Sequence, residues 1–228
     1  IPLVVDYRDP WLENVAYYFA TPMHRRYAAS LEAAVLKRAE GVVVVNRRIK
    51  EQLVARYPFL THESVHIIPS GYDPADFKAA SRFPLERSRR FRITFSGISD
   101  VHQTPKTFFG ALAKLFARRP DLRDEIEVVF VGSFHASYHK MAHAMGVASS
   151  IVATGYVDHT EAIRYLFASD VLWLSAVDPA VTPGKVHEYI GTGKPILALC
   201  PPGVLRQVLR EYGAAVSLDV TDVDGVTA

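Results

Sequence analysis

The stretch Thr182-Pro-Gly-Lys-Val-His-Glu-Tyr-Ile-Gly-Thr-Gly-Lys-Pro195 separates two mainly apolar runs, 171–175 and 196–200. Short apolar runs bounded by turn residues are typical of strands that are buried on both faces of a parallel sheet. The residues between them carry the start and stop signals of a helix. The stretch therefore predicts a strand–helix–strand unit, around which the other segments can be placed.

The helix in this unit has clear ends. Thr182 is a favoured N-cap residue, and Pro183 suits the first helical position because the N–H that it lacks would have no partner there. Gly191 and Gly193 follow the last apolar turn and end the helix. The prediction is a helix from Pro183 to about Ile190.

The start of this helix has the features of an anion site. A helix that follows a strand of a parallel sheet points its N-terminus at the carboxyl edge, where free N–H groups and the helix dipole attract phosphate. Lys185 adds a positive charge, and Glu188 lies three residues later on the same face. Such a pair could bind a diphosphate and a diol together. The alternative is an ordinary amphipathic helix with an i,i+3 ion pair.

Composition sets only broad limits. The chain has 228 residues, enough for one large domain or two small ones, and 49% of them are hydrophobic, as in ordinary globular proteins. Its formal net charge of +2 neither requires nor excludes an anionic partner. Cys200 is the one cysteine, so that no intrachain disulfide is possible and a reducing compartment is expected. The first residues already read as a strand and lack an initiator methionine, which suggests that the natural N-terminus lies further upstream.

Strands alternate with helices along the chain. This order predicts an α/β fold with parallel sheets that are covered on both faces. The predicted strands are 1–7, 41–45, 65–68, 91–95, 126–131, 151–154, 171–175, 196–200 and 214–218. The predicted helices are 22–39, 47–57, 105–118, 136–145, 159–168, 183–190 and 204–212.

The pattern lapses between residues 74 and 90, where the sequence is polar and basic. We interpret residues 1–80 as part of an N-terminal domain, 81–90 as a linker and 91–228 as a C-terminal domain. The arginines of the linker have no aromatic residues or binding motif beside them, which favours a solvated connector over a nucleic-acid interface.

Two further places can carry chemistry. Thr104-Pro105-Lys106 opens a helix in the same way as the stretch around Lys185, so that two lysines could converge on one anion at the carboxyl edge of the sheet. Coincidence is the alternative, because Thr-Pro is a common helix opening. Arg8 and Asp9 directly follow the first strand, where α/β proteins place their sites; a surface ion pair or a turn fixed by Asp9-Pro10 is the alternative.

Other patterns are less informative. His135, His139 and His143 share a helix face, but they lack the further ligand of a zinc site, so that a solvated face is favoured and no metal is expected. Gly97 and Gly132 follow strands without completing a G-x-G-x-x-G fingerprint, which argues against a nicotinamide dehydrogenase.

Four segments in the right order resemble the GT-B glycosyltransferases of the retaining family 4 type. They are IPLVVDYRDPW (1–11), AEGVVVV followed by IIPSGYDPADF (39–45 and 67–77), VFVGSFH with IVATGYVDHTEAIRYLFASDVLWLS (129–135 and 151–175), and PGKVHEYIGTGKPILAL (183–199). The resemblance implies two Rossmann-like domains, with the first half of the N-terminal domain and the last helix of the C-terminal domain outside this chain. A nucleoside-diphosphate-sugar donor would bind mainly to the C-terminal domain, without a metal cofactor.

The resemblance also implies roles for single residues. Glu188 matches the second glutamate of the family's E-x7-E pattern, which binds ribose hydroxyls, and Lys106 and Lys185 match the cations at the diphosphate. Gly97 would let the backbone approach the donor, and Tyr156 and Val157 would lie beside the base. The donor-binding residues expected on this basis are Gly97, Gly132, Tyr156, Val157, Pro183, Gly184 and Glu188, and the catalytic ones are Lys106, Lys185, Arg8 and Asp9.

This sequence departs from the family pattern in three places. Ala180 stands where the first glutamate of E-x7-E is expected, so that a contact to the sugar is lost or supplied by another residue such as Asp178. Ile98 stands in place of an arginine, and Arg8 in place of a cleft histidine.

The function expected from the resemblance is transfer of a sugar to a sugar or lipid-linked acceptor, in surface polysaccharide or glycolipid synthesis. The expected location is the cytoplasm, with contact to the inner membrane surface as an option, and no nucleic-acid partner. The alternatives are a sugar-nucleotide epimerase of the same architecture, which would need acid/base groups in the cleft, and a nucleotide-binding subunit without catalysis.

Overall fold

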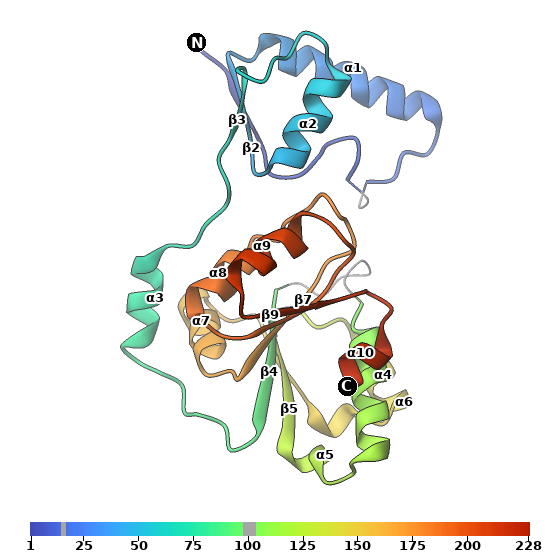
Figure 1. Cartoon of the computed structure of the whole chain (residues 1–228), viewed down its shortest axis with the longest axis vertical. Helices are drawn as coiled ribbons and strands as arrows, with labels where there is room; N and C mark the ends of the chain where they lie inside the picture. Colours follow the sequence, from blue (N-terminus) through green and yellow to red (C-terminus); the bar gives the residue numbers. More distant parts are fainter. Residues whose placement is uncertain (15–16, 98–103) are drawn as a thin grey trace. The chain divides into compact units, whose positions relative to one another are not determined.

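The computed structural model describes residues 1–14, 17–97 and 104–228. These residues form two compact units (Figure 1). Unit 1 comprises Ile1–Ser70 with Ala180–Thr182, and unit 2 comprises Gly71–Pro179 with Pro183–Ala228. Each unit contains one sheet in which all strand pairs are parallel, as the alternation of strands and helices predicts.

Unit 1 is built on a three-stranded sheet in the order β1-β2-β3. Its strands are β1 (Val4–Tyr7), β2 (Gly41–Val44) and β3 (Val65–Ile67), and its helices are α1 (Pro22–Arg38) and α2 (Arg47–Arg56). The side chain of Thr21 caps α1 by accepting from the His24 N–H at 3.4 Å, and that of Asn46 caps α2 by accepting from the Ile49 N–H at 3.0 Å. These caps explain why both helices begin where the sequence predicts.

The core of unit 1 includes a fully buried carboxylate, Glu32 on α1. Its oxygens accept hydrogen bonds from the hydroxyls of Tyr7, at 3.1 Å, and Tyr57, and the Arg56 guanidinium lies 3.7 Å away. Burial raises the pKa of Glu32, against the lowering effect of the two hydroxyls, and burial with the adjacent carboxylate raises the pKa of both tyrosines. A buried charge of this kind persists only when all its partners are in place.

Unit 2 is built on a six-stranded sheet in the order β6-β5-β4-β7-β8-β9. The chain begins at the centre with β4, moves outward to β6, and returns to place β7 on the other side of β4. The crevice between β4 and β7 is therefore the topological switch point, where sheets of this type bind ligands. The strands are β4 (Phe91–Ser96), β5 (Ile126–Val131), β6 (Ile151–Gly155), β7 (Val171–Ser175), β8 (Ile196–Leu199) and β9 (Ala215–Leu218).

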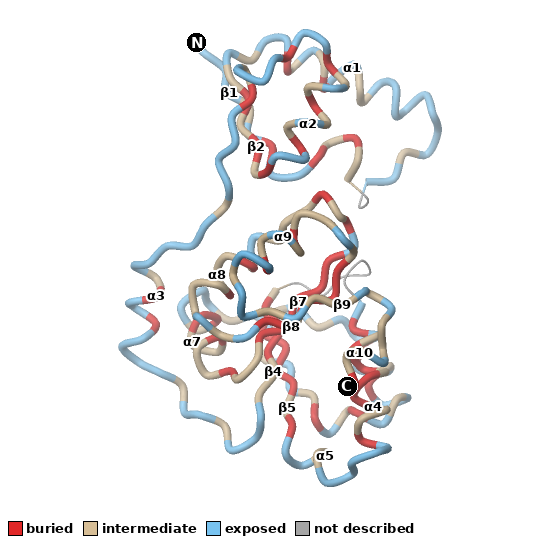
Figure 2. Tube along the Cα trace, in the orientation of Figure 1, coloured by how far each residue is buried: buried red, intermediate tan, exposed pale blue. Residues whose placement is uncertain are grey.

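Helices cover both faces of this sheet. On one face, an aromatic cluster surrounds Trp173, whose ring stacks on Phe108 with centroids 4.3 Å apart and contacts Phe95 and Phe130. On the other face, Leu172 and Leu174 pack with α8 and α9. Figure 2 shows the buried residues concentrated along the central strands. The helices are α4 (Lys106–Arg118), α5 (Leu122–Glu125), α6 (Ala136–Ala144), α7 (His159–Phe167), α8 (Lys185–Thr192), α9 (Val204–Tyr212) and α10 (Val223–Thr227), with a 3₁₀ turn at Ala148–Ser150.

Residues 74–81 form a helix, α3 (Pro74–Ser81), where the sequence pattern predicts irregular structure. Asp73 caps it by accepting from the Ala75 N–H at 2.8 Å, and Pro74 occupies its first position. Its one large apolar residue, Phe77, is buried against Phe167 of α7. With one large apolar residue, the segment shows no helical periodicity of apolar positions. Asp73 and Pro74 are nevertheless residues that commonly begin a helix. Residues 71–80, placed by sequence in the N-terminal domain, thus pack in unit 2.

The central helix α8 differs from its prediction at both ends. It begins at Lys185, with Gly184 as its N-cap, and Thr182 makes no cap. It continues through Gly191 to Thr192 and ends at Gly193, which adopts the left-handed conformation (φ 70°). The predicted strands all occur, within three residues of the expected ends. None of the helices in the described part of the chain is long and apolar enough to cross a bilayer.

Candidate functional site

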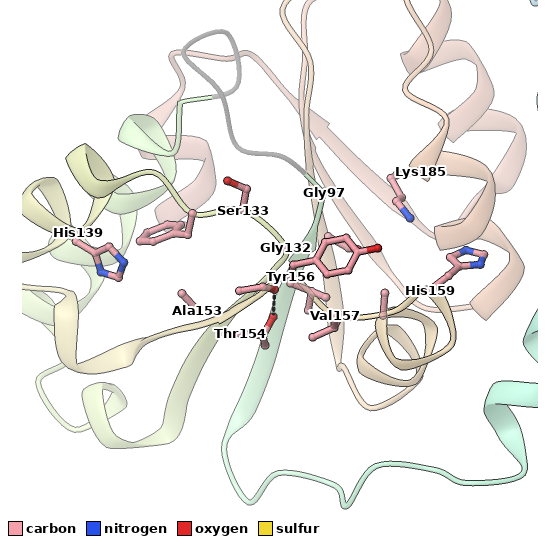
Figure 3. Close-up of a pocket in the computed structure, with 15 residues that line it drawn as sticks. Gly97, Gly132, Ser133, His139, Ala153, Thr154, Tyr156, Val157, His159 and Lys185 are labelled. Atoms are coloured by element: carbon pink, nitrogen blue, oxygen red, sulfur yellow. Dashed lines mark hydrogen bonds between the residues drawn. The ribbon is translucent and has the colours of Figure 1, made fainter.

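A pocket of about 880 Å³ opens at the carboxyl ends of β4, β5 and β6 (Figure 3). Parallel strands end at the same edge of a sheet, so that their terminal residues and the helix starts that follow them meet there. Five residues predicted to act on the donor line this pocket: Gly97, Gly132, Tyr156, Val157 and Lys185. The other lining residues are Ser96, Val131, Ser133, Phe134, His139, Ala153, Thr154, Gly155, His159 and Ala162.

Glycine backbone forms the inner wall of the pocket. The N–H of Gly97 donates to the Val131 carbonyl at 2.9 Å, and the N–H of Gly132 donates to the Gly155 carbonyl at 3.0 Å. Gly97 and Gly132 have φ values of 144° and 117°. A Cβ on Gly132 would lie 2.4 Å from the Gly97 carbonyl oxygen. Side chains are therefore excluded here, and the backbone stays open to a ligand.

Lys185 and Glu188 lie together in the first turn of α8. The ammonium nitrogen of Lys185 is 2.8 and 3.0 Å from the two carboxylate oxygens of Glu188. Both side chains are partly buried, and Lys185 lines the pocket. Lys185 thus forms the ion pair that the spacing predicts and also lines the pocket, whereas Glu188 is not among the lining residues. Pro183 and Gly184 directly precede this turn, and the Val186 N–H donates to the Pro183 carbonyl at 3.0 Å.

His159, at the start of α7, lies beside the same carboxylate. Its Nε2 is 3.5 Å from Oε1 of Glu188, and its Nδ1 is 3.3 Å from Oδ2 of Asp76 on α3. Figure 3 shows Lys185 and His159 at one end of the pocket and His139 at the other. The sequence analysis missed His159. The one available signal was the Asp158 cap, which places residue 159 at a helix start next to a strand end.

The opposite end of the pocket is aromatic. The rings of Phe134 and His139 meet at 90° with centroids 4.6 Å apart. Between the two ends lies Tyr156, which is 94% exposed (Figure 3). Of the three histidines on the α6 segment, His139 alone lines the pocket, whereas His135 caps the helix by accepting from the Ser137 N–H. Among the described residues, no three or more His, Cys, Asp or Glu side chains are arranged so that they could hold a metal ion.

A buried hydroxyl connects α8 to the sheet below the pocket. The Tyr189 oxygen accepts from the Ser96 N–H at 2.8 Å and lies 3.2 Å from the Trp173 carbonyl, to which it donates. Tyr189 is fully buried, and this burial raises the pKa of its hydroxyl. The bond fixes the residue before Gly97 relative to the helix that carries Glu188. Sequence reasoning could not find it, because it joins residues 93 positions apart.

Other predicted residues lie elsewhere. Lys106 begins α4, where its N–H is 3.4 Å from the Thr104 hydroxyl, and it is not among the residues that line the pocket. The predicted convergence of Lys106 and Lys185 therefore stays a prediction. Ile98 lies outside the described residues. Asp178 is buried, and the carbonyl of Ala180, which is also buried, accepts from the Asn46 side chain at 3.0 Å.

Arg8 and Asp9 lie in unit 1, directly after β1. They line a smaller pocket of about 270 Å³ together with Trp11 and Tyr17. Arg8 is exposed and forms an ion pair of 3.6 Å with Asp6. The surface ion pair that was the alternative thus occurs, and a catalytic role for Arg8 and Asp9 stays a prediction.

No family model matches the chain, and no curated protein sequence does. Solved structures, in contrast, share its fold. WaaG, "a glycosyltransferase involved in lipopolysaccharide biosynthesis", matches 100% of this chain with a TM-score of 0.76 and 16% identity. Anabaena HepE in complex with UDP and glucose matches 99% with a TM-score of 0.71 and 15% identity. Sucrose-phosphate synthase from Thermosynechococcus elongatus matches 98% with a TM-score of 0.67 and 18% identity.

These matches confirm the predicted GT-B fold with its Rossmann-like parallel sheets. At such identities the likeness establishes the fold and not the reaction. The chain spans 65%, 61% and 56% of the three matched chains, respectively.

Proposed function

We propose that this protein is a glycosyltransferase that transfers a sugar from a nucleoside-diphosphate-sugar to an acceptor. One observation carries the proposal: the pocket of unit 2 joins a glycine-backbone wall to Lys185 at the start of α8, and Lys185 pairs with the carboxylate of Glu188, which is not itself among the lining residues. Backbone and cation suit a diphosphate, and the carboxylate suits the hydroxyls of a ribose. Structures of HepE in complex with UDP and with UDP-glucose are among those that share the fold, which supports this assignment.

Each part of the donor has a place in the proposal. The diphosphate lies near Gly97, the α8 start at Pro183 and Gly184, and Lys185. Glu188 binds the ribose, and the base lies beside Tyr156, Val157 and Gly132. Lys106 supplies a second cation.

The chemical step breaks the bond between the anomeric carbon and the diphosphate oxygen and forms a bond from that carbon to an acceptor hydroxyl oxygen, whose proton passes to the leaving diphosphate. Negative charge then develops on the leaving diphosphate, and fixed N–H groups and lysines that are already in place stabilise it. No metal is needed for this role. We also propose that the anomeric configuration is retained, and that Arg8 and Asp9 act from unit 1 on the acceptor side.

The proposed acceptor is a sugar or a lipid-linked glycan of surface polysaccharide or glycolipid synthesis. The involvement of WaaG in lipopolysaccharide biosynthesis supports this class. We propose a cytoplasmic protein that works at the membrane surface when its acceptor is lipid-linked.

Calorimetric titration of UDP, GDP and ADP tests the donor site. At least one nucleotide should bind, and Glu188→Ala should weaken binding by on the order of 1–3 kcal/mol, the size of a lost charged hydrogen bond. Glu211→Ala, which removes a carboxylate from the exposed side of α9, is the matched control and should leave the affinity unchanged. Absence of nucleotide binding, or equal binding by Glu188→Ala and the unmodified protein, would show that the donor site is assigned wrongly.

A nucleotide-binding subunit without catalysis is the second candidate. Ala180 favours it, because its methyl group replaces the expected sugar-facing carboxylate and its carbonyl is engaged by Asn46. Incubation of the full-length protein with a nucleotide-sugar separates the candidates. A glycosyltransferase consumes donor when acceptor is added, an epimerase converts the donor without acceptor, and a binding subunit leaves the donor intact.

A further inference from the structure

His159 stands between two carboxylates that come from different helices. Nε2 faces Glu188 at 3.5 Å, and Nδ1 faces Asp76 at 3.3 Å. Either ring nitrogen can donate to the carboxylate that it faces when it carries the hydrogen, so that this single ring stands next to both carboxylates. All three residues belong to unit 2, and His159 lines the pocket.

The position of Asp76 is set by packing of α3. Phe77, the next residue, packs on Phe167 with ring centroids 5.6 Å apart and on Tyr72 at 4.7 Å. Both Tyr72 and Phe77 lie against Gly191 of α8, where an added Cβ would come within 3.0 Å of their rings. The carboxylate of Asp76 is therefore held beside α7 and α8 by buried contacts.

Glu188 faces a conflict when a donor binds. Both of its oxygens contact Lys185, which has to turn to the diphosphate in the proposed function. A carboxylate that loses this cation at a half-buried place would shift or attract water. His159 can remove this conflict if its Nε2 stays beside Oε1 of Glu188 as a second donor. Oε2 of Glu188 is then left to accept from the ribose.

We propose that His159 is a positioning residue that holds Glu188 for the ribose while Lys185 binds the diphosphate, and that Asp76 orients the His159 ring. This inference rests on the proposed function, since it concerns the same donor site. With Asp76, the helix α3 becomes one of the elements that build the site. This helix lies directly after the point at which the chain enters unit 2.

The test uses UDP and 2′,3′-dideoxy-UDP, or the corresponding pair if GDP or ADP is the nucleotide that binds. The dissociation constant of the dideoxy nucleotide divided by that of UDP reports the contacts to the ribose hydroxyls alone. This ratio is large when those contacts contribute to binding. His159→Gln places an amide N–H near the position of Nε2 and should keep the ratio within about twofold, whereas His159→Asn places it near Nδ1 and should lower the ratio about three- to tenfold. Asp76→Asn should lower the ratio less than His159→Asn does.

The ratio also separates the possible failures. A general structural defect weakens both nucleotides alike, so that an unchanged ratio in His159→Asn and Asp76→Asn overturns the inference. A ratio lowered equally by His159→Gln and His159→Asn overturns it too, because the Nε2 donor would then be irrelevant. If the unmodified protein binds no nucleotide, or if Glu188→Ala leaves the ratio unchanged, the proposed function itself fails.

Discussion

The two sheets of this protein present different chemistry at their carboxyl edges. In unit 2 the strands β4, β5 and β6 end in or directly before glycines, Gly97, Gly132 and Gly155, so that this part of the edge consists of backbone. In unit 1 the first strand ends in the charged side chains of Arg8 and Asp9. A backbone edge suits a ligand that is bound through its phosphates, because no side chain keeps the phosphates away from the chain. A side-chain edge suits groups that move or exchange protons.

The cores differ in the same sense. The core of unit 2 is apolar and aromatic around Trp173, whereas that of unit 1 holds the carboxylate of Glu32 between two tyrosines. An apolar core tolerates repacking, but a buried charge fails when one partner is removed. Unit 1 should therefore be the more fragile of the two, and the predictions below test this difference.

Glu32→Ala should have the largest effect on stability. It leaves two buried tyrosine hydroxyls without their acceptor and removes one of the two carboxylates near Arg56, which keeps its ion pair with Glu13; unit 1 should be destabilised by about 3–5 kcal/mol. Hydrogen exchange followed by mass spectrometry resolves the two units, and amides of α1 and β1 should exchange faster while those of β4 and β5 are unaffected. Glu32→Gln, which keeps the acceptor oxygen, should cost less. Equal protection of α1 in Glu32→Ala and the unmodified protein would contradict this view of the core.

The same carboxyl predicts a pH dependence. Burial raises the pKa of Glu32 above its ordinary 4.5, so that the folded protein binds this proton more tightly than the unfolded chain does. The resulting stability is full below about pH 4.5 and is lost as the pH rises through the folded pKa. The free energy of unfolding of the unmodified protein, relative to Glu32→Gln, should thus fall as the pH increases over this window. A difference that rises with pH would contradict the sign of the shift.

Gly132→Ala should damage the backbone edge of unit 2. The added Cβ would meet the Gly97 carbonyl oxygen at 2.4 Å in a left-handed backbone, which should cost about 2–4 kcal/mol and weaken nucleotide binding by more than about tenfold. Gly146→Ala is the control: its φ is also positive, at 68°, but nothing lies within 4 Å of the added atom. It should cost about 1 kcal/mol and leave nucleotide binding unchanged. Equal losses in both variants would mean that backbone strain, and not the contact, is decisive.

Tyr189→Phe should have a smaller effect. It leaves the buried Ser96 N–H without a partner, at a cost of about 1–3 kcal/mol, and loosens the residue next to Gly97. Nucleotide affinity, measured by calorimetry, should fall severalfold. Tyr212→Phe removes a similar hydroxyl, which donates to the Lys194 carbonyl over 2.9 Å. Neither residue lines the pocket, so that this variant should leave the affinity unchanged. If both variants bind nucleotide equally well, the Tyr189 hydroxyl does not support the site.

Arg8→Ala should change stability least, by less than about 0.5 kcal/mol, because the side chain is exposed. In the full-length protein it should keep nucleotide affinity but lower the transfer rate by about a hundredfold, the size of a lost stabilising group. Arg47→Ala, another exposed arginine of unit 1, pairs with Glu51 at 2.7 Å and serves as the control with normal transfer. Normal transfer by Arg8→Ala would remove the catalytic role proposed for the edge of unit 1.

The sequence by itself determined the local structure. Apolar runs located every strand, and the caps Thr21, Asn46 and Asp158 begin helices at the expected places. Spacing alone placed Lys185 and Glu188 on one face of α8. These features depend on residues within about one helical turn or one strand, where propensity and capping act.

Only the tertiary structure decided which segments share the pocket. It brought His159 between Asp76 and Glu188, joined Tyr189 to Ser96, packed α3 on α7, and set Gly132 against Gly97. None of these contacts leaves a local pattern, because each joins elements that are distant in the chain and meet only after the sheet has formed. The order of strands in that sheet, which is a global property of the chain, therefore fixed the site that the local signals could only outline.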